Sequence, residues 1–185
     1  AVFLLLLPLS VPASSGSEIA AQPLGGLHHS GTNSALNVLR GVPEYTTIAL
    51  ESPDIVVEER NEAFTSKKVF GIPGEPFIME EGVPMVPQVP RFYRIPNIGC
   101  VDLVLTNTDF ELVEDVDVMP YQIEGSEHFG SARSSVYDQD QWYPPAVAEM
   151  SEPMIMRDFR VVRLVLYPVQ VNPVTRQARV YHNLS

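Results

Sequence analysis

RVVRLVLYPVQVNPVTRQARVYHNL, residues 160–184, is the clearest strand pattern in the 185-residue chain. Valine and leucine dominate its two ends, and both favour the pleated geometry of strands. The four residues 172–175, Asn-Pro-Val-Thr, have the composition of a tight turn, because asparagine bonds nearby backbone groups and proline fixes φ. We therefore predict a β-hairpin in which Arg160–Leu166 pairs with Gln177–Leu184.

Short strand-like runs recur before this stretch, separated by turn residues and prolines. They are residues 45–50, 55–59, 67–72, 91–95, 100–105, 110–113 and 116–119. The chain has 17 prolines, which argue against long helices and against a central strand before residue 91. The pattern predicts an all-β domain over residues 45–185: an antiparallel two-sheet β-sandwich, jelly-roll-like, built from short proline-punctuated strands.

The segment before residue 45 has a different character. Residues 1–11, AVFLLLLPLSV, form an uncharged apolar run of signal-peptide length. A small-residue cleavage site ends at Ala13, so residues 1–13 are predicted to be a signal peptide without its charged start; the alternative is a buried apolar strand. Residues 14–44 are predicted to be a flexible leader. The strand pattern that runs to Leu184 predicts a precursor that continues beyond Ser185.

The charge of the chain limits its partners. The net charge is −11, which disfavours nucleic acid, because phosphate binding needs clustered Lys and Arg. Five arginines and one aspartate lie between Arg157 and Arg179, a local charge of +4 that leaves −15 for the rest. This basic segment is either a solvated strand face or an edge that meets an acidic partner domain. No membrane contact is expected for the mature form.

No catalytic constellation is visible in the sequence. The only cysteine, Cys100, begins an apolar strand without a cationic neighbour, which predicts an inert thiol in the core or at an edge. The histidines are His28, His29, His128 and His182, and none lies in a recognisable catalytic context. Phosphate-loop and zinc motifs are absent from the sequence as well. We therefore expect no catalysis, no cofactor and no metal in this segment.

One acidic cluster needs comparison with a calcium site. Its members are Asp109, Glu111, Glu114, Asp115 and Asp117. Calcium requires six to eight oxygens that converge on one point, whereas a strand sends alternate side chains to opposite faces. Solvated turn charges are therefore the favoured interpretation, with calcium as the alternative.

Two stretches resemble the N-terminal propeptide domain of gingipain-type (family C25) cysteine peptidases. The first, Gly71–Gln122, contains GIPGEPFIMEEGVPMVPQVPRFYRIPN and later VMPYQ. The second and more specific, Tyr143–Leu184, contains an Arg-rich strand, YPVQVNP and the return strand ARVY. The family often has a glycine in the final hairpin turn, where this chain has Arg176 and Gln177 after Thr175.

The resemblance implies a β-sandwich prodomain that assists folding and keeps an attached peptidase latent during export. It also implies a downstream caspase-like catalytic domain with a His–Cys dyad that this chain does not contain, and secretion to the bacterial surface or beyond. The polar loop Gly125–Ser135 is predicted to be the inhibitory or cleavage loop. The gingipain group includes Arg-specific enzymes, and Arg133 is the only Lys or Arg in this loop, so we expect it to approach the specificity pocket. The alternative is a solvated arginine.

A rival hypothesis comes from another class of protein. Proline-punctuated strands and an acidic surface also fit a secreted or cell-surface β-sandwich binding or adhesion module with no peptidase attached. The coding sequence after Ser185 discriminates the two, because a prodomain requires a following α/β domain with a Cys/His pair.

Overall fold

The computed structural model describes residues 4–8, 36–42, 45–51, 53–62, 65–127 and 129–185. The described strands form two larger sheets and a separate hairpin, with antiparallel pairing between strands throughout. The first sheet contains β1 (Leu4–Pro8), β2 (Leu36–Val42), β3 (Tyr45–Glu51), β7 (Val101–Leu105), β8 (Thr108–Val113), β12 (Val169–Asn172) and β13 (Gln177–Leu184). The second contains β6 (Val89–Arg94), β9 (Ala148–Met150), β10 (Met154–Met156) and β11 (Phe159–Leu166).

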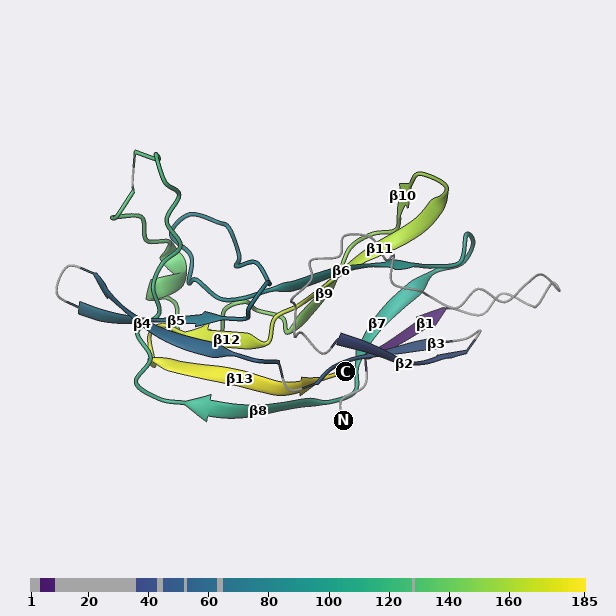
Figure 1. Ribbon diagram of the computed structural model, residues 1–185, viewed down its shortest axis with the longest axis horizontal. Coiled ribbons are helices and arrows are strands. Elements are labelled where there is room, and N and C mark those ends of the chain that lie inside the picture. Colours follow the sequence, from purple (N-terminus) through teal and green to yellow (C-terminus); the bar gives the residue numbers. More distant parts are fainter. Residues whose placement is uncertain (1–3, 9–35, 43–44, 52, 63–64, 128) are drawn as a thin grey trace.

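The separate hairpin consists of β4 (Val56–Glu62) and β5 (Thr65–Gly71). A single 3-10 turn, η1 (Ser135–Asp138), is the only helical element among the described residues. The predicted all-β fold with antiparallel sheets is therefore confirmed, and Figure 1 shows the arrangement of its strands.

The first strand predicted for the C-terminal hairpin is wrong. The strand β13 pairs with β12, whereas β11 belongs to the second sheet and pairs with β6, β9 and β10. Pro168 explains the break, because a proline has no N–H for a continuing ladder. The carbonyl of Pro168 accepts from Tyr181 N at 2.9 Å, which joins the crossing point to β13. One apolar run thus supplies a strand to each sheet.

The turn of this hairpin forms as its sequence predicts. The side-chain Oδ1 of Asn172 accepts hydrogen bonds from Val174 N at 3.1 Å and Thr175 N at 3.2 Å. Arg176 follows in the left-handed region, with φ 55°, and pairs with Asp115 at 2.7 Å. Glycine adopts this conformation without strain. Arg176 therefore has the backbone conformation that would suit the glycine expected in this turn from the family resemblance.

Strand β6 starts earlier than predicted, since it begins at Val89 and includes Pro90. Pro90 lies opposite Val165 in the ladder with β11. Within the described residues β6 pairs with β11 alone, which makes it an edge strand. An edge strand can contain proline, because one side of its backbone has no neighbouring strand and needs no N–H donor there. The proline rule therefore excludes a central strand here but not an edge strand.

Part of the N-terminal segment is ordered as strands. The strand β1 lies between β3 and β7, and β2 pairs with β3. The apolar run Leu4–Pro8 thus takes a strand pairing, which was the alternative to a signal peptide, while cleavage after Ala13 stays a prediction outside the described residues. The predicted leader, 14–44, contains β2 at its end, and residues 14–35 also lie outside them.

Two buried clusters stabilise the fold. One joins the two larger sheets and contains Tyr93, Leu164 and Leu184, while the other lies under the β4–β5 hairpin and contains Phe70, Val118 and Val180. A bulge between Tyr181 and Asn183 changes the face of β13 that points inward, so that Val180 belongs to one cluster and Leu184 to the other. The hairpin is therefore packed on the same strand that closes the sandwich.

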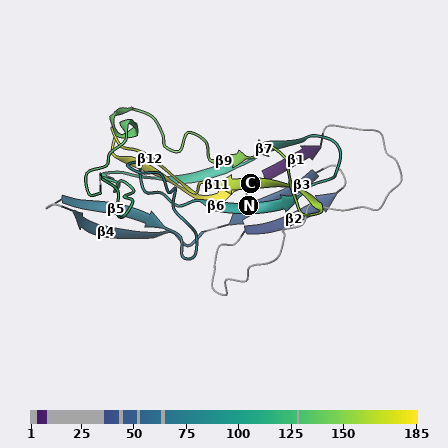
Figure 2. The same cartoon turned by 90° about the horizontal axis from the view of Figure 1, so that it is seen from above.

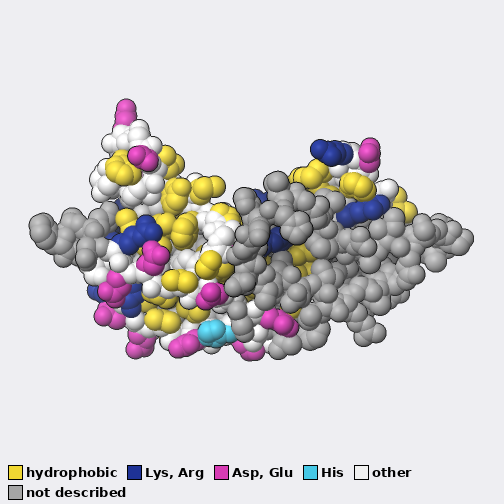
Figure 3. All heavy atoms as spheres, viewed as in Figure 1, with side chains coloured by type: hydrophobic (Ala, Val, Ile, Leu, Met, Phe, Trp, Pro, Cys, Tyr) yellow, Lys and Arg dark blue, Asp and Glu magenta, His cyan; other side chains and the backbone are white. Residues whose placement is uncertain are grey.

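The molecule is elongated, with two projections on the same side (Figure 1). One is the loop of residues 121–134 beside η1, and the other is the β10–β11 hairpin. β6 and β9 lie between the two projections (Figure 1), and Figure 2 shows the same strands from above. The space-filling view shows the two projections standing apart (Figure 3).

Two tyrosines with raised pKa values should make the fold less stable at alkaline pH. Burial raises the pKa of Tyr143 to about 12, and burial together with a 3.0 Å hydrogen bond to Glu149 raises the pKa of Tyr167 to about 12. Both folded-state values lie above the unfolded value of about 10. The stabilisation is therefore complete below pH 10 and is lost as the pH rises from about 10 towards 12.

Urea unfolding between about pH 9 and about pH 11 checks this expectation, because the free energy of unfolding should fall across that range. Tyr167→Phe should make the fall shallower by removing one titrating hydroxyl. If the free energy of unfolding falls as steeply with pH in Tyr167→Phe as in the unmodified chain, the hydroxyl of Tyr167 does not contribute to the loss of stability.

Candidate functional site

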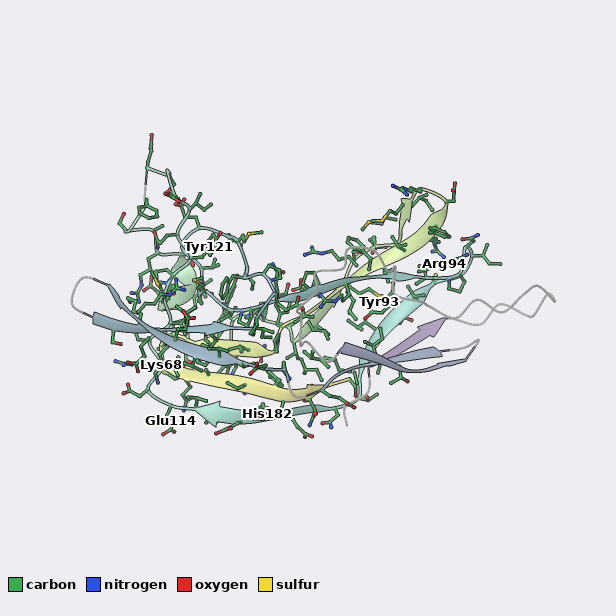
Figure 4. All side chains as sticks on the ribbon, in the orientation of Figure 1. Lys68, Tyr93, Arg94, Glu114, Tyr121 and His182 are labelled. Atoms are coloured by element: carbon green, nitrogen blue, oxygen red, sulfur yellow. The ribbon has the colours of Figure 1, made fainter. Side chains whose placement is uncertain are left out.

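The projecting loop, residues 121–134, is closed by the side chain of Gln122. Its Nε2 donates to Ala132 O at 2.9 Å, and its Oε1 accepts from Gly130 N at 2.9 Å. A single amide thus connects the first and last parts of the loop. The polar loop predicted at Gly125–Ser135 lies in this projection, and Figure 4 labels Tyr121 at its base.

Gly82 fixes the base of the projecting loop through its backbone. Gly82 N donates to Tyr121 O at 2.7 Å, and Gly82 O accepts from Ser134 N at 2.9 Å. The φ of Gly82 is +81°, and a Cβ added there would lie 2.9 Å from Ser134 N and 3.1 Å from Arg133 N. Only glycine allows this conformation and this close approach together. The backbone on both sides of the loop is therefore held by one residue of a neighbouring segment.

Arg133 lies at the end of the projecting loop on an ordered aromatic platform. Its guanidinium carbon is 4.4 Å from the centroid of the Tyr137 ring. Tyr137 is buried, and its hydroxyl donates to Val118 O at 3.0 Å. A hollow of 350 Å³ beside the arginine is lined by Glu81 and residues 131–134. The platform presents an exposed positive group next to a concave surface.

The tip of the projecting loop is apolar and acidic. Ile123 is 43% exposed and Phe129 is 59% exposed, while Glu124 and Glu127 are exposed beside them. Exposed aromatic residues next to a fixed arginine are the composition that protein interfaces favour. The loop therefore has the features of a contact surface.

A substitution at Gly82 should release the loop. In Gly82→Ala the new Cβ must push the backbone of Arg133 and Ser134 away, so trypsin should cut after Arg133 about tenfold faster than in the unmodified chain. Gly130→Ala is the matched control, because Gly130 has the same φ of +81° but nothing within 4 Å of the added atom. N-terminal sequencing of the fragments identifies the cut. Equal cleavage rates in the two variants would contradict this function of Gly82.

Two of the residues considered for catalysis, Cys100 and His182, lie among the described residues. Cys100 is a free, exposed thiol directly before β7, which places it at an edge rather than in the core. The Nε2 of His182 lies 3.3 Å from Glu111 Oε2 on the exposed face of β13 and β8. His28, His29 and His128 lie outside the described residues.

The acidic cluster is divided among separate partners. Asp115 pairs with Arg176 at 2.7 Å, Asp117 with Lys67 at 3.4 Å, and Glu111 with His182. Within the described ranges, no group of three or more His, Cys, Asp or Glu side chains could hold a metal ion. Figure 4 places Glu114 and His182 along the edge opposite the two projections.

The sequence indicated the loop and Arg133 but not the residues that fix them. Gln122, Gly82 and Tyr137 come from three separate segments, and only folding brings them to the base of the loop. The Glu-Gly-Val turn at residues 81–83 was the one local signal for the position of Gly82.

The family model Propeptide_C25 matches residues 54–185 of this chain. The chain is similar to gingipain R2 of Porphyromonas gingivalis, with 27% identity over 109 residues, 56% of this chain and 15% of that protein. Gingipain R1 of the same species is 23% identical over 113 residues, 58% of this chain and 11% of that protein. The chain thus corresponds to a small fraction of the length of these relatives.

Two solved structures share the fold. One is the complex of Porphyromonas gingivalis RgpB pro- and mature domains, with a TM-score of 0.74 and 21% identity, covering 82% of this chain and 83% of that chain. The other concerns the zymogenic latency of gingipain K from the same species, with a TM-score of 0.62 and 16% identity, covering 90% of this chain and 98% of that chain. At this identity the likeness concerns the fold.

Proposed function

Because the chain belongs to the Propeptide_C25 family, we propose that it is the prodomain of a gingipain-like cysteine peptidase, a tethered inhibitor and folding aid for a catalytic domain downstream in the same precursor. The observation that carries this proposal is the projecting loop, whose exposed Arg133 is fixed at the base by Gly82. The shared fold with a structure described as a complex of pro- and mature domains supports it.

Inhibition would follow from the way the loop is held. We infer that Arg133 enters the specificity pocket of the catalytic domain, as an arginine side chain of a substrate would. A substrate must adopt an extended backbone and release its ends after cleavage. The hydrogen bonds of Gln122 and Gly82 connect both sides of the loop, which keeps its backbone from extending and its two halves from separating. Arg133 therefore occupies the pocket without being a good substrate.

A covalent link strengthens modest contacts. A domain attached by a short linker is present at an effective concentration in the millimolar range, so an intrinsic affinity in the micromolar range suffices for latency. Cleavage of the linker removes this advantage, and the free prodomain then dissociates on dilution. Activation thus requires no conformational change within the β-sandwich.

Export of the precursor is part of the proposal. The apolar run at residues 1–11 has the length and composition of a signal peptide, and the similar proteins come from a bacterium. Among the residues that the structure describes, none form a helix with the length and apolarity that a membrane crossing needs. We propose secretion to the cell surface or the medium.

Two experiments test the proposal against an adhesion module. The coding sequence after Ser185 should encode an α/β domain with a Cys/His pair, whereas further β-repeats would favour adhesion. When the purified chain is titrated into that peptidase domain, hydrolysis of a small arginyl substrate should fall to background at a 1:1 ratio. Full activity at every ratio would overturn the proposed function.

A further inference from the structure

The tip of the β10–β11 hairpin is an exposed apolar strand. Ile155 is 71% exposed, and Met154 and Met156 are each 38% exposed, so β10 has no buried residue. Exposed runs of apolar residues are unusual in soluble domains unless they bind something. The hairpin tip, defined here as residues 154–157, therefore requires a function other than packing of the core.

The hairpin tip is held in a fixed position. Ile155 lies opposite Arg160 in the ladder with β11, and Arg160 Nη1 donates to Pro96 O and Gly99 O, both at 2.9 Å. The guanidinium carbon of Arg94 is 4.6 Å from the centroid of the Phe159 ring. Three segments thus support the tip, so binding would order few additional groups and lose little entropy.

The charge of this end differs from the rest of the molecule. Arg157, Arg160 and Arg163 belong to the β10–β11 hairpin and Arg94 to the neighbouring strand β6, against the two acidic residues Glu152 and Asp158 of the hairpin segment, so this end has a surplus of two positive charges in a chain of net charge −11. Figure 3 shows Lys and Arg side chains gathered at this projection, and Figure 4 labels Arg94 beside it. The tip is suited to a surface that is apolar at its centre and acidic at its rim.

The position of the tip identifies the partner. It rises on the same side as the projecting loop and is separated from it by β6 and β9 (Figure 1). A domain that receives Arg133 lies over this side, and its surface then continues towards the tip. We propose that the hairpin tip is a second docking surface for the downstream peptidase domain, binding an apolar patch with an acidic rim outside the catalytic cleft. This inference rests on the proposed function.

The two docking surfaces would have separate functions. The projecting loop blocks the cleft, and the hairpin tip supplies affinity at a distance from it. The two contacts lie on different segments of the chain and share no residue, so their effects on binding should add. Loss of the tip should therefore accelerate dissociation while the bound chain still blocks the cleft.

The test uses the whole chain and the peptidase domain of its own precursor. Ile155→Asp places a charge at a position that is 71% exposed, so the fold is retained and the thermal midpoint should stay unchanged. Dissociation, followed by surface-immobilised binding, should become at least about tenfold faster. Val174→Asp is the matched control, because Val174 is 48% exposed in the β12–β13 turn. Met154→Ser/Met156→Ser should accelerate dissociation in the same direction.

The outcomes separate the two proposals. If the unmodified chain does not bind the peptidase domain, the proposed function fails. If it binds and blocks the cleft but Ile155→Asp dissociates as slowly as Val174→Asp, the second docking surface is wrong. Sedimentation analysis tests a third outcome. If the unmodified chain self-associates and Ile155→Asp abolishes this association, the tip binds a second copy of the chain and the proposal is wrong.

Discussion

Arg133→Ala should weaken inhibition of the downstream peptidase domain about 100-fold, equivalent to about 2.7 kcal/mol of binding free energy. An arginine that fills a specificity pocket contributes as a central anchor of an interface, and such anchors account for most of the binding free energy. Within the prodomain the change should be nearly neutral, because Arg133 is exposed and loses only its contact with the Tyr137 ring. The inhibition constant against a small substrate is the measurement.

Two further variants define the contact. Arg60→Ala removes another exposed arginine, on β4, where it pairs with Glu58 in an exposed ion pair, and should leave the inhibition constant unchanged. Arg133→Lys keeps the charge but loses the planar guanidinium, so an intermediate effect is expected. An inhibition constant that is the same in Arg133→Ala and in the unmodified chain would show that the loop does not enter the pocket.

Glu75→Gln should lower the free energy of unfolding by about 3 to 5 kcal/mol. The Glu75 side chain is 2% exposed and accepts from Arg91 twice, at 2.5 Å to Oε1 and 3.0 Å to Oε2. The pair joins the turn at Pro73-Gly74 to the edge strand β6, and the hydrogen bonds that Arg91 donates to Glu75 raise the pKa of Arg91. The substitution removes the carboxylate charge that pairs with the partly buried Arg91 guanidinium.

Urea unfolding measures this loss as a lower midpoint with an unchanged slope. Glu58→Gln is the control, because the Arg60–Glu58 pair is exposed and should contribute no more than about 1 kcal/mol. Domains of this size are stable by about 5 to 15 kcal/mol, so this loss would be a large share of the total free energy of unfolding. Equal midpoints for the two variants would contradict a stabilising function of the buried pair.

Local patterns in the sequence predicted several of the strands and the turn at Asn172, but the strand predicted at residues 116–119 is wrong, because that segment forms only an isolated bridge between Val118 and Lys68. The turn at Asn172 forms through its own side chain, which is a short-range property that the residue types specify. Alternation predicted a strand at 100–105, and the structure has β7 at Val101–Leu105. The loop with Arg133 was recognisable because small and polar residues replace the apolar rhythm.

Pairing between distant segments was the part that the sequence did not determine. The break at Pro168 marks a change of sheet, but nothing in residues 160–184 says which strands β11 joins. Strand β2 was missed because the segment around it has the composition of a leader. The edge position that allows Pro90 inside β6 is likewise a property of the complete sheet.

The same distinction applies to the functional surface. Arg133 could be selected as the basic residue of a polar loop, whereas Gly82 acts only through a backbone contact with a loop about 50 residues away. The exposed residues of β10 look like an ordinary strand in the sequence, and only their position beyond the sandwich makes them accessible.

Protection of the catalytic thiol is the most direct test of whether this domain covers the cleft of its partner. The downstream peptidase domain is treated with iodoacetamide, and the alkylation rate of its cysteine is measured alone and with an equimolar amount of the chain. Alkylation should slow to background in the complex and recover with Arg133→Ala at the same concentration. A complex that forms while its thiol reacts at the uncomplexed rate would mean that the β-sandwich binds elsewhere and is not the inhibitor.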